Sequence, residues 1–441
     1  MNLTGKKLLV LGATPNEIPL VNRAQALGVY VIVTDYNLDH KISPAKDIAN
    51  EYWDVSWSDT EKLAQRCKEK GIDGVTAGFS EFRIDSLIQL TSLLGLPCYV
   101  SPEQLRITRD KALFKKTCRK YGVPVIREYS SIDSVTQYPV IVKPVDRAGS
   151  IGVGIAKNYI ELVKAYEEAM KKSVVKQVII EDYIINAVEI DVHYALCNGE
   201  IILLCTDDII PATNNQADSK VVQSAWLYPS RYEGEFLDKV DSTLRKLIRG
   251  LGMNDGTVFF SGFADGNGEF QFFECGYRLW GEQEFEYDYR RGLVNYLDIY
   301  IYHALGFSSQ SIERNHAGNS ALKGVAINCY VTEGTITSIS GIEKVHQMPD
   351  CTLALLDSYI GQKCDGSKAI LTKSALIAFS SEDPTILEND VQRLYQELYI
   401  ANEMGENMLY DRIACGVIST WWDDMTGNKA ADRFGNTDER F

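Results

Sequence analysis

Lysine and glycine residues come together in one segment of this 441-residue chain in an order suited to binding phosphate. Residues 140–142 are an apolar run that predicts a buried strand, and Lys143 stands at its end. Residues 146–154 follow with three glycines in six positions, which lets several backbone N–H groups approach one anion. A P-loop instead places Lys after the loop and before Ser or Thr. We therefore expect a hairpin that covers a polyphosphate, with an ordinary glycine-turn hairpin as the alternative.

A second group of charged residues follows an aromatic-rich strand, FQFF. Glu274, Arg278 and Glu282 occur there at intervals of four residues. A carboxylate for Mg²⁺ and a guanidinium for a reacting carboxylate or phosphate are the pair that phosphoryl transfer needs. Strand alternation puts Phe272 and Glu274 on one face and turns Glu269 away, so Glu269 is not expected to be a second metal ligand.

Three further segments contain residues that suit a nucleotide or its co-substrate. Asp110 and Lys111 begin a predicted helix, and a second lysine near the same phosphates makes electrostatic sense. Residues 181–184 end an apolar strand and can present backbone groups to an adenine edge, and the Glu189 carboxylate suits two ribose hydroxyls. Lys220 lies in a polar stretch that could line a substrate site. Taken singly, a helix lysine or a strand-end glutamate of this kind is more often a solvated surface residue than a ligand-binding one.

The elements that must position these residues begin with an α/β region. Short strands at 7–11, 29–34 and 74–77 alternate with helices, which predicts a doubly wound parallel sheet. The turn after the first strand, residues 12–15, lacks the dinucleotide fingerprint, so a nicotinamide cofactor is not expected.

The chain as a whole predicts an α+β organisation in four parts. Strands at 256–263 and 269–275 are joined by a DGNG turn, a strong hairpin signal, and short β segments resume after residue 323. We divide the chain into an α/β domain at 1–105, a central domain at 106–319 with a lid at about 125–187, a β-rich lobe at 320–420, and a polar tail at 421–441.

Composition excludes several classes of function. The net charge of −15 argues against a nucleic-acid-binding surface, which requires a basic face. The ten cysteines are scattered without a CxxC pair, and none of the five histidines is paired at ligand spacing, so buried thiols are expected rather than disulfides or zinc. No apolar run has the length of a membrane span or a signal peptide. We expect a cytoplasmic protein, with a homodimer as the base-rate oligomer.

Taken together, the order and spacing of these motifs resemble those of the ATP-grasp ligases, over most of the chain. The resemblance implies a preceding α/β domain at 1–105 and, at 320–415, the small C-terminal lobe found in biotin carboxylase and amino-acid ligases. It also implies ATP and Mg²⁺, or Mn²⁺, as cofactors, and a small carboxylate and an amine as substrates.

Carried over to this sequence, the resemblance assigns a role to each motif. Lys111 and Lys143 would bind ATP phosphates, with a mobile loop over them that contains Ser150 and Gly152. The backbone of Glu181, Asp182, Tyr183 and Ile184 would hold adenine, and Glu189 would hold the ribose. Glu274 would bind the metal ion, Arg278 would lie beside the acyl-phosphate, and Lys220 and Glu282 would lie near the acid substrate.

Two positions depart from the pattern of that family. The family usually places an acidic residue about a dozen positions before Glu274, where this chain has Ser261 or Gly262, and an Asn two positions after it, where this chain has Gly276. Both residues normally ligate metal. The departures leave three possibilities: one metal ion, rescue by a neighbour such as Glu282, or weakened catalysis.

The leading hypothesis is an ATP-dependent ligase that activates a carboxylate as an acyl-phosphate and joins it to an amine, with an amino acid as one substrate. A formyl- or carboxy-phosphate enzyme similar to those of purine synthesis fits the same domain order. A catalytically weakened nucleotide-binding protein is the third possibility, motivated by the missing metal ligands. The sequence does not name the acid or the amine.

Overall fold

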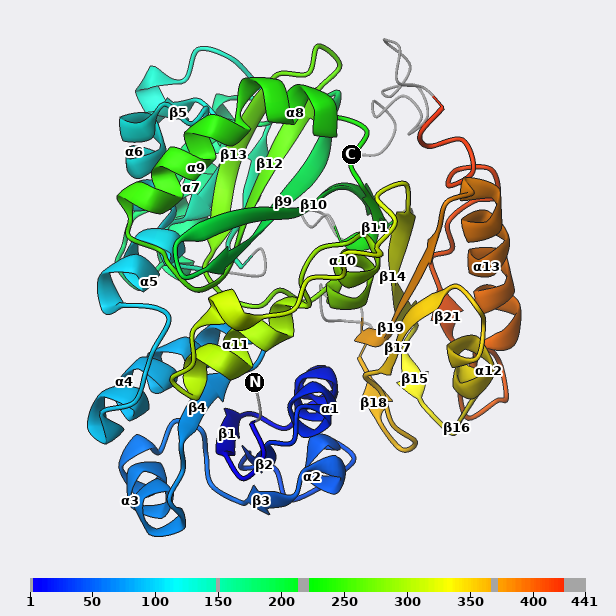
Figure 1. The fold of residues 1–441 in the computed structure, drawn as a ribbon. Helices are drawn as coiled ribbons and strands as arrows, with labels where there is room; N and C mark the ends of the chain where they lie inside the picture. The colour runs from blue at the N-terminus through cyan, green and yellow to red at the C-terminus, as the bar shows by residue number, and fades with distance from the viewer. Residues whose placement is uncertain (1–2, 148–150, 213–221, 366–371, 424–441) are drawn as a thin grey trace.

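A computed structural model describes residues 3–147, 151–212, 222–365 and 372–423 of the chain (Figure 1). Its first unit is a parallel four-stranded sheet of order β3-β2-β1-β4. The strands are β1 (Lys7–Leu11), β2 (Tyr30–Thr34), β3 (Glu51–Trp53) and β4 (Gly74–Ala77). Helices α1 (Ile18–Ala26), α3 (Thr60–Lys70) and α4 (Ile84–Leu94) alternate with them. This arrangement confirms the doubly wound parallel sheet that the alternating pattern predicts.

Two consecutive helices, α5 (Pro102–Arg109) and α6 (Lys111–Tyr121), connect this sheet to the rest of the molecule. Asp110 lies between them in an extended conformation, and its carboxylate accepts a hydrogen bond from the backbone N–H of Leu113 at 2.8 Å. Such a side-chain cap satisfies an N–H group that the first helical turn leaves free. The cap therefore places Lys111 in the first turn of α6.

A second, four-stranded sheet has the order β5-β8-β6-β7 and is backed by α7 (Tyr159–Lys172). Its strands are β5 (Glu128–Tyr129), β6 (Val140–Pro144), β7 (Gly154–Ala156) and β8 (Val178–Asp182). Strands β6 and β7 pair antiparallel, which confirms the hairpin around the glycine-rich loop. The sheet has a small apolar core of its own, which includes Val140, Val142 and Leu162.

The largest sheet follows the path β13-β12-β9-β10-β11-β14-β19-β17 and is antiparallel throughout, with β21 (Leu409–Tyr410) paired to β14. Its other strands are β9 (Ala187–Cys197), β10 (Glu200–Pro211), β11 (Gln223–Tyr228), β12 (Gly256–Asp265), β13 (Phe270–Gly276), β14 (Lys323–Val331), β17 (Cys351–Leu356) and β19 (Thr372–Ser381). Because β11 pairs with β14, the sheet continues across residue 320 without a break. The domain limits stay a prediction.

The remaining helices cover this sheet and fill the space between the units. In Figure 1, α13 lies on the outer side of the C-terminal strands and α11 lies between the parallel sheet and the large one. Their bounds are α8 (Glu233–Lys239), α9 (Asp241–Gly250), α10 (Phe285–Arg290), α11 (Tyr296–Ala304), α12 (Ile342–His346) and α13 (Pro384–Glu397). Across the described ranges, no helix combines the length and apolar character that crossing a membrane requires.

A bulge in β13 corrects the predicted orientation of Glu274. Ser261 of β12 pairs with Glu274, but the next residue, Gly262, pairs with Phe272, so Phe273 is an extra residue in the ladder. One extra residue reverses the alternation of side chains beyond it. Phe272 accordingly packs in the core, whereas Glu274 is on the opposite face, so the prediction that they share a face is wrong.

Candidate active site

Lys111 and Glu274, which are far apart in the sequence, meet where α6 begins beside β13. The Lys111 ammonium lies 3.9 Å from Glu274 Oε2 and donates to the backbone carbonyl of Arg147 at 3.0 Å. The Glu274 side chain remains more than one-third exposed. A cation from a helix start and a carboxylate from a strand therefore share one solvent-accessible position.

Lys143 lies on β6 next to a fully buried carboxylate. Its ammonium is 2.8 Å from Glu181 Oε2 and 5.3 Å from the centre of the Phe273 ring. Burial and the nearby Lys111 ammonium lower the pKa of Lys143 to about 8, and the Glu274 carboxylate acts in the opposite direction. Lys115 of α6 contacts the other oxygen of Glu181. Glu181 therefore contacts the amino groups of two lysines from two different elements.

The segment predicted to hold adenine already uses part of its backbone within the protein. The N–H of Asp182 donates to the Arg127 carbonyl and that of Tyr183 donates to the Pro139 carbonyl, both at 3.1 Å. Ile184 is half-buried at the end of the segment. An adenine edge would thus be read by the remaining backbone groups of the segment rather than by these two N–H groups.

Glu189 lies near the start of β9 and accepts a hydrogen bond from Gln223 Nε2 at 3.0 Å. Burial raises its pKa to about 7, and the Glu274 carboxylate adds to the shift. The Glu189 carboxylate is therefore electrostatically coupled to Glu274 and to Lys143, the predicted metal and phosphate ligands.

Cross-strand pairing places four polar residues in one row across the large sheet. Asp207 of β10 pairs with Asp191 of β9, Asp191 with Ser261 of β12, and Ser261 with Glu274 of β13. Directly opposite residues of an antiparallel pair project to the same face, so all four share a face. Burial, followed by repulsion from Asp207, raises the pKa of Asp191 well above its ordinary value.

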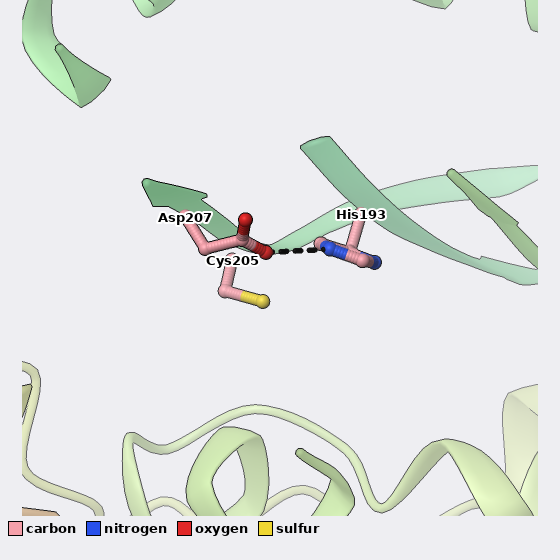
Figure 2. A group of neighbouring side chains, drawn as sticks. All are labelled: His193, Cys205 and Asp207. Carbon is pink, nitrogen blue, oxygen red and sulfur yellow. Dashed lines mark hydrogen bonds and ion pairs between the residues drawn. The ribbon is translucent and has the colours of Figure 1, made fainter. Parts of the chain in front are cut away.

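His193 and Cys205 pair across β9 and β10 two residues along the strands from Asp191 and Asp207, and both lie beside Asp207 (Figure 2). His193 Nε2 lies 2.8 Å from Asp207 Oδ2, and the potential ligand atoms of His193, Cys205 and Asp207 lie within 4.8 Å of one another. The other carboxylate oxygen of Asp207 accepts the backbone N–H of Asp191 at 3.2 Å. The Asp207 carboxylate, which is also held by His193, therefore restrains the backbone of Asp191.

Phe259 occupies the volume that a side chain at position 276 would need. A Cβ atom on Gly276 would lie 2.2 Å from Cε1 of the Phe259 ring. Arg278 stacks on the same ring, 5.0 Å from its centre, and donates to the Leu279 carbonyl at 2.8 Å. The ring thus excludes the Asn of the family pattern and supports the guanidinium.

Arg278 also faces the first α/β unit. Its Nε lies 3.9 Å from Glu81 Oε2, and both residues line a small hollow with Ile84, Leu105, Thr108, Cys275, Gly276 and Tyr277. The turn at residues 78–81, which follows β4, therefore forms part of the wall beside the Arg278 guanidinium.

Of the four remaining predicted site residues, the structure describes two. Ser150 and Lys220 lie outside the described residues. Gly152 adopts φ +78°, and a Cβ there would lie 2.8 Å from Lys172 and 2.9 Å from Pro144, so only glycine fits. Glu282 is half-buried, and its charge raises the pKa of Asp207 and Glu284.

Sequence reasoning missed Lys115, Asp191 and His193. Lys115 carries no signal beyond its place four residues after Lys111, and its burial against Glu181 is a tertiary contact. Asp191 and His193 alternate with apolar residues on β9, a pattern that also suits a solvated strand face. Only the pairing with β10 and β12 shows that this face is buried.

Known proteins were compared with this chain. Residues 115–242 match the family model "D-ala D-ala ligase C-terminus". The C-terminal section of the carbamoyl phosphate synthase large chain of Methanocaldococcus jannaschii is 26% identical over 275 residues, 56% of this chain and 43% of that protein. The D-alanine–D-alanine ligase of Fusobacterium nucleatum is 30% identical over 172 residues, 38% of this chain and 55% of that enzyme.

A formate-dependent phosphoribosylglycinamide formyltransferase of Francisella tularensis is 25% identical over 194 residues, 42% of this chain and 50% of that enzyme. The chain therefore spans about half the length, or less, of the curated relatives it matches.

Solved structures match over nearly the whole chain. An L-amino acid ligase from Bacillus licheniformis superimposes with a TM-score of 0.71 at 18% identity, covering 91% of this chain and 99% of that one. The chain has the ATP-grasp fold. The biotin carboxylase domain of a Hydrogenobacter thermophilus 2-oxoglutarate carboxylase, solved as a dimer with MgADP and bicarbonate, also matches, with a TM-score of 0.71 at 18% identity. It covers 95% of this chain and 93% of that one. The predicted resemblance to ATP-grasp proteins is confirmed.

Proposed function

We propose that this ATP-grasp protein is an ATP-dependent ligase that joins a small carboxylate to an amine. The observation that carries the proposal is the convergence of Lys111, Lys143 and Glu274 from a helix start and two different sheets. Two ammonium groups and one carboxylate beside a glycine-containing hairpin suit a metal-bound polyphosphate. The names of the relatives, among them a D-alanine–D-alanine ligase and an L-amino acid ligase, support an amino acid as one substrate.

The proposed reaction has two steps. The carboxylate oxygen of the acid attacks the γ-phosphorus of ATP, the bond to the β–γ bridging oxygen breaks, and an acyl-phosphate and ADP form. The amine then attacks the acyl carbon, loses a proton and expels inorganic phosphate. Lys111 and Lys143 would orient the phosphates, and Arg278, held on the Phe259 ring, would offset charge on the acyl-phosphate. Lys220 and Glu282 would lie beside the acid.

Glu274 fits a magnesium ion because it is an exposed carboxylate, the hard oxygen ligand that this ion prefers. When bound, the ion would offset the negative charge of the ATP phosphates. The sheet β5-β8-β6-β7 would act as the lid that carries Lys143 and the adenine segment. Its closure would exclude water from the acyl-phosphate.

The test is ADP release from Mg-ATP in the presence of pools of carboxylic acids and amino acids. We expect release that depends on an acid and that falls by about 100-fold or more in Lys143→Ala, because a preorganised cation is lost. Lys164→Ala, an exposed lysine on α7, is the matched control and should keep wild-type release. Turnover retained in Lys143→Ala would contradict the role of Lys143.

Two alternatives make different predictions in the same assay. The similarity to a formate-dependent formyltransferase favours formate or bicarbonate as the acid, which separate pools would reveal. The Phe259 ring at the position of a family metal ligand favours a nucleotide-binding protein with weak or no catalysis. Binding of ADP by calorimetry without acid-dependent ADP release would support that last alternative.

A further inference from the structure

Asp191 and Glu274 flank Ser261 on one face of the large sheet. Asp191 is directly opposite Ser261 on one side, and Glu274 is directly opposite it on the other. Opposite Cβ atoms lie about 5 Å apart, so the two acidic residues are separated by about 10 Å at Cβ and their carboxylates can converge above Ser261. The Ser261 side chain is short, and its hydroxyl is within hydrogen-bonding reach of the Asp191 carboxylate.

The Asp191 carboxylate has an unused oxygen in a buried position. Asp191 is only 7% exposed, and its Oδ1 accepts no hydrogen bond from any group in the described ranges. A buried carboxylate oxygen without a donor costs free energy unless a ligand supplies the missing partner. The oxygen therefore points to a cationic or hydrogen-bonding ligand on this face.

The neighbouring acidic residues are already engaged. Asp207 uses one oxygen for the Asp191 N–H and the other for His193 (Figure 2). Glu189 is held by Gln223 and pairs with Phe263, two residues farther along the ladder. Asp191 thus differs from Asp207 and Glu189 in being directly opposite Ser261 and in having a buried oxygen without a hydrogen-bond donor among the described residues.

The two strands that usually supply metal ligands are restricted in this chain. A side chain on Gly262 would meet the Gln271 carbonyl at 2.8 Å, and one on Gly276 would meet the Phe259 ring at 2.2 Å. Ser261 has a hydroxyl but no charge. A second carboxylate for a cation beside Glu274 must therefore come from outside β12 and β13, and Asp191 of β9 is directly opposite Ser261.

From this row of residues we infer that Asp191 of β9 is the second carboxylate of the divalent-cation site and replaces the acidic residue missing from β12. The inference rests on the proposed function for the identity of the cation, but the juxtaposition of Asp191, Ser261 and Glu274 does not depend on it. The chain thus keeps two carboxylates at the site with a ligand set that crosses three strands.

The experiment measures Mn²⁺ binding to the full chain, by calorimetry and by the EPR signal of free Mn²⁺, with and without saturating ADP. In Asp191→Asn we expect binding at least tenfold weaker than in wild type. In the double variant Asp191→Asn/Ser261→Asp we expect recovery to within threefold of wild type, because the new carboxylate on β12 lies directly between positions 191 and 274. Glu269→Gln, on the exposed end of the same hairpin, is the control and should bind as wild type.

The outcomes separate the inference from the proposed function. Wild-type Mn²⁺ affinity in Asp191→Asn, or no Mn²⁺ binding by wild type, would overturn the inference even if ADP binds. Weak Mn²⁺ binding that Ser261→Asp restores would support it even if no acid releases ADP. Asp191→Ser, which removes the carboxylate with a smaller side chain, replaces Asp191→Asn if thermal unfolding shows that the latter is not folded.

Discussion

Glu181 shows how one buried carboxylate organises the site at the scale of single residues. It is fully buried and contacts Lys115 and Lys143, one at each oxygen. A buried carboxylate between two lysine amines restrains both side chains, because its removal would leave two buried amines without an opposite charge. The sequence presents Glu181 as a strand end beside adenine, but its side chain acts first as the anchor of Lys143.

Asp390 of α13, which lies away from the site, has a carboxyl group whose pKa shift can be tested directly. Burial and the neighbouring Asp350 raise the pKa of Asp390 to about 6. The folded state therefore binds more protons than the unfolded state between pH 4 and 6, and the contribution of Asp390 to stability is lost as the pH rises through 6. Asp390 should be a destabilising charge at neutral pH.

We predict that Asp390→Asn raises the free energy of unfolding at pH 7.5 by about 1 kcal/mol, a value reduced for the partial exposure of the group. The gain should disappear at pH 4, where the wild-type carboxyl is protonated. Thermal unfolding of both proteins from pH 4 to 8 measures the difference. A gain that does not change with pH would contradict the titration of Asp390.

At the scale of elements, the hairpin β12–β13 decides the chemistry of the site. Its bulge at Phe273 turns Glu274 out of the core and toward Lys111. Close packing of Phe259 against Gly276 then leaves room for Arg278 on the ring but not for a side chain on the strand. The same hairpin thus provides one metal ligand and excludes another.

We predict that Gly276→Ala lowers the free energy of unfolding by about 1–3 kcal/mol, because the added methyl overlaps the Phe259 ring. Gly281→Ala is the matched control, since no atom lies within 4 Å of a Cβ there. Urea unfolding measures both variants. In a protein that already carries Phe259→Ala, Gly276→Ala should lower the free energy of unfolding by less than it does in wild type. An equal loss in both backgrounds would show that the ring is not the cause.

At the scale of the whole molecule, the site depends on how the α/β unit docks on the large sheet. Apolar residues of both units form continuous clusters, and Arg23 of α1 makes a two-fold hydrogen-bonded ion pair with Asp298 of α11, each contact at 2.6 Å. The same docking brings Glu81 to Arg278. A weaker interface would therefore loosen one wall of the site.

We predict a coupling of about 1–2 kcal/mol between Arg23 and Asp298 in a double-mutant cycle with Arg23→Met and Asp298→Asn. The value is modest because the Arg23 side chain is one-third exposed, although Asp298 is buried. The cycle is measured by urea unfolding. Arg106→Met with Glu103→Gln, an exposed pair within α5, should show a coupling near zero. Equal couplings for the two pairs would contradict a special role for the buried interface.

The sequence by itself determined the features that depend on neighbouring residues. Strand and helix periodicity, the helix that begins at Asp110 and Lys111, and the glycine-rich hairpin all follow from local pattern, and the structure has them where they were predicted. The order of the motifs was sufficient to predict the ATP-grasp fold.

Only the tertiary structure decided which charged residues meet. The bulge that reverses Glu274, the burial of Lys115 against Glu181, and the row from Asp207 to Glu274 all arise from contacts between strands or helices distant in the sequence. Alternation along one strand specifies two faces but not which face is covered. Register between strands, set by packing of the whole sheet, makes that choice.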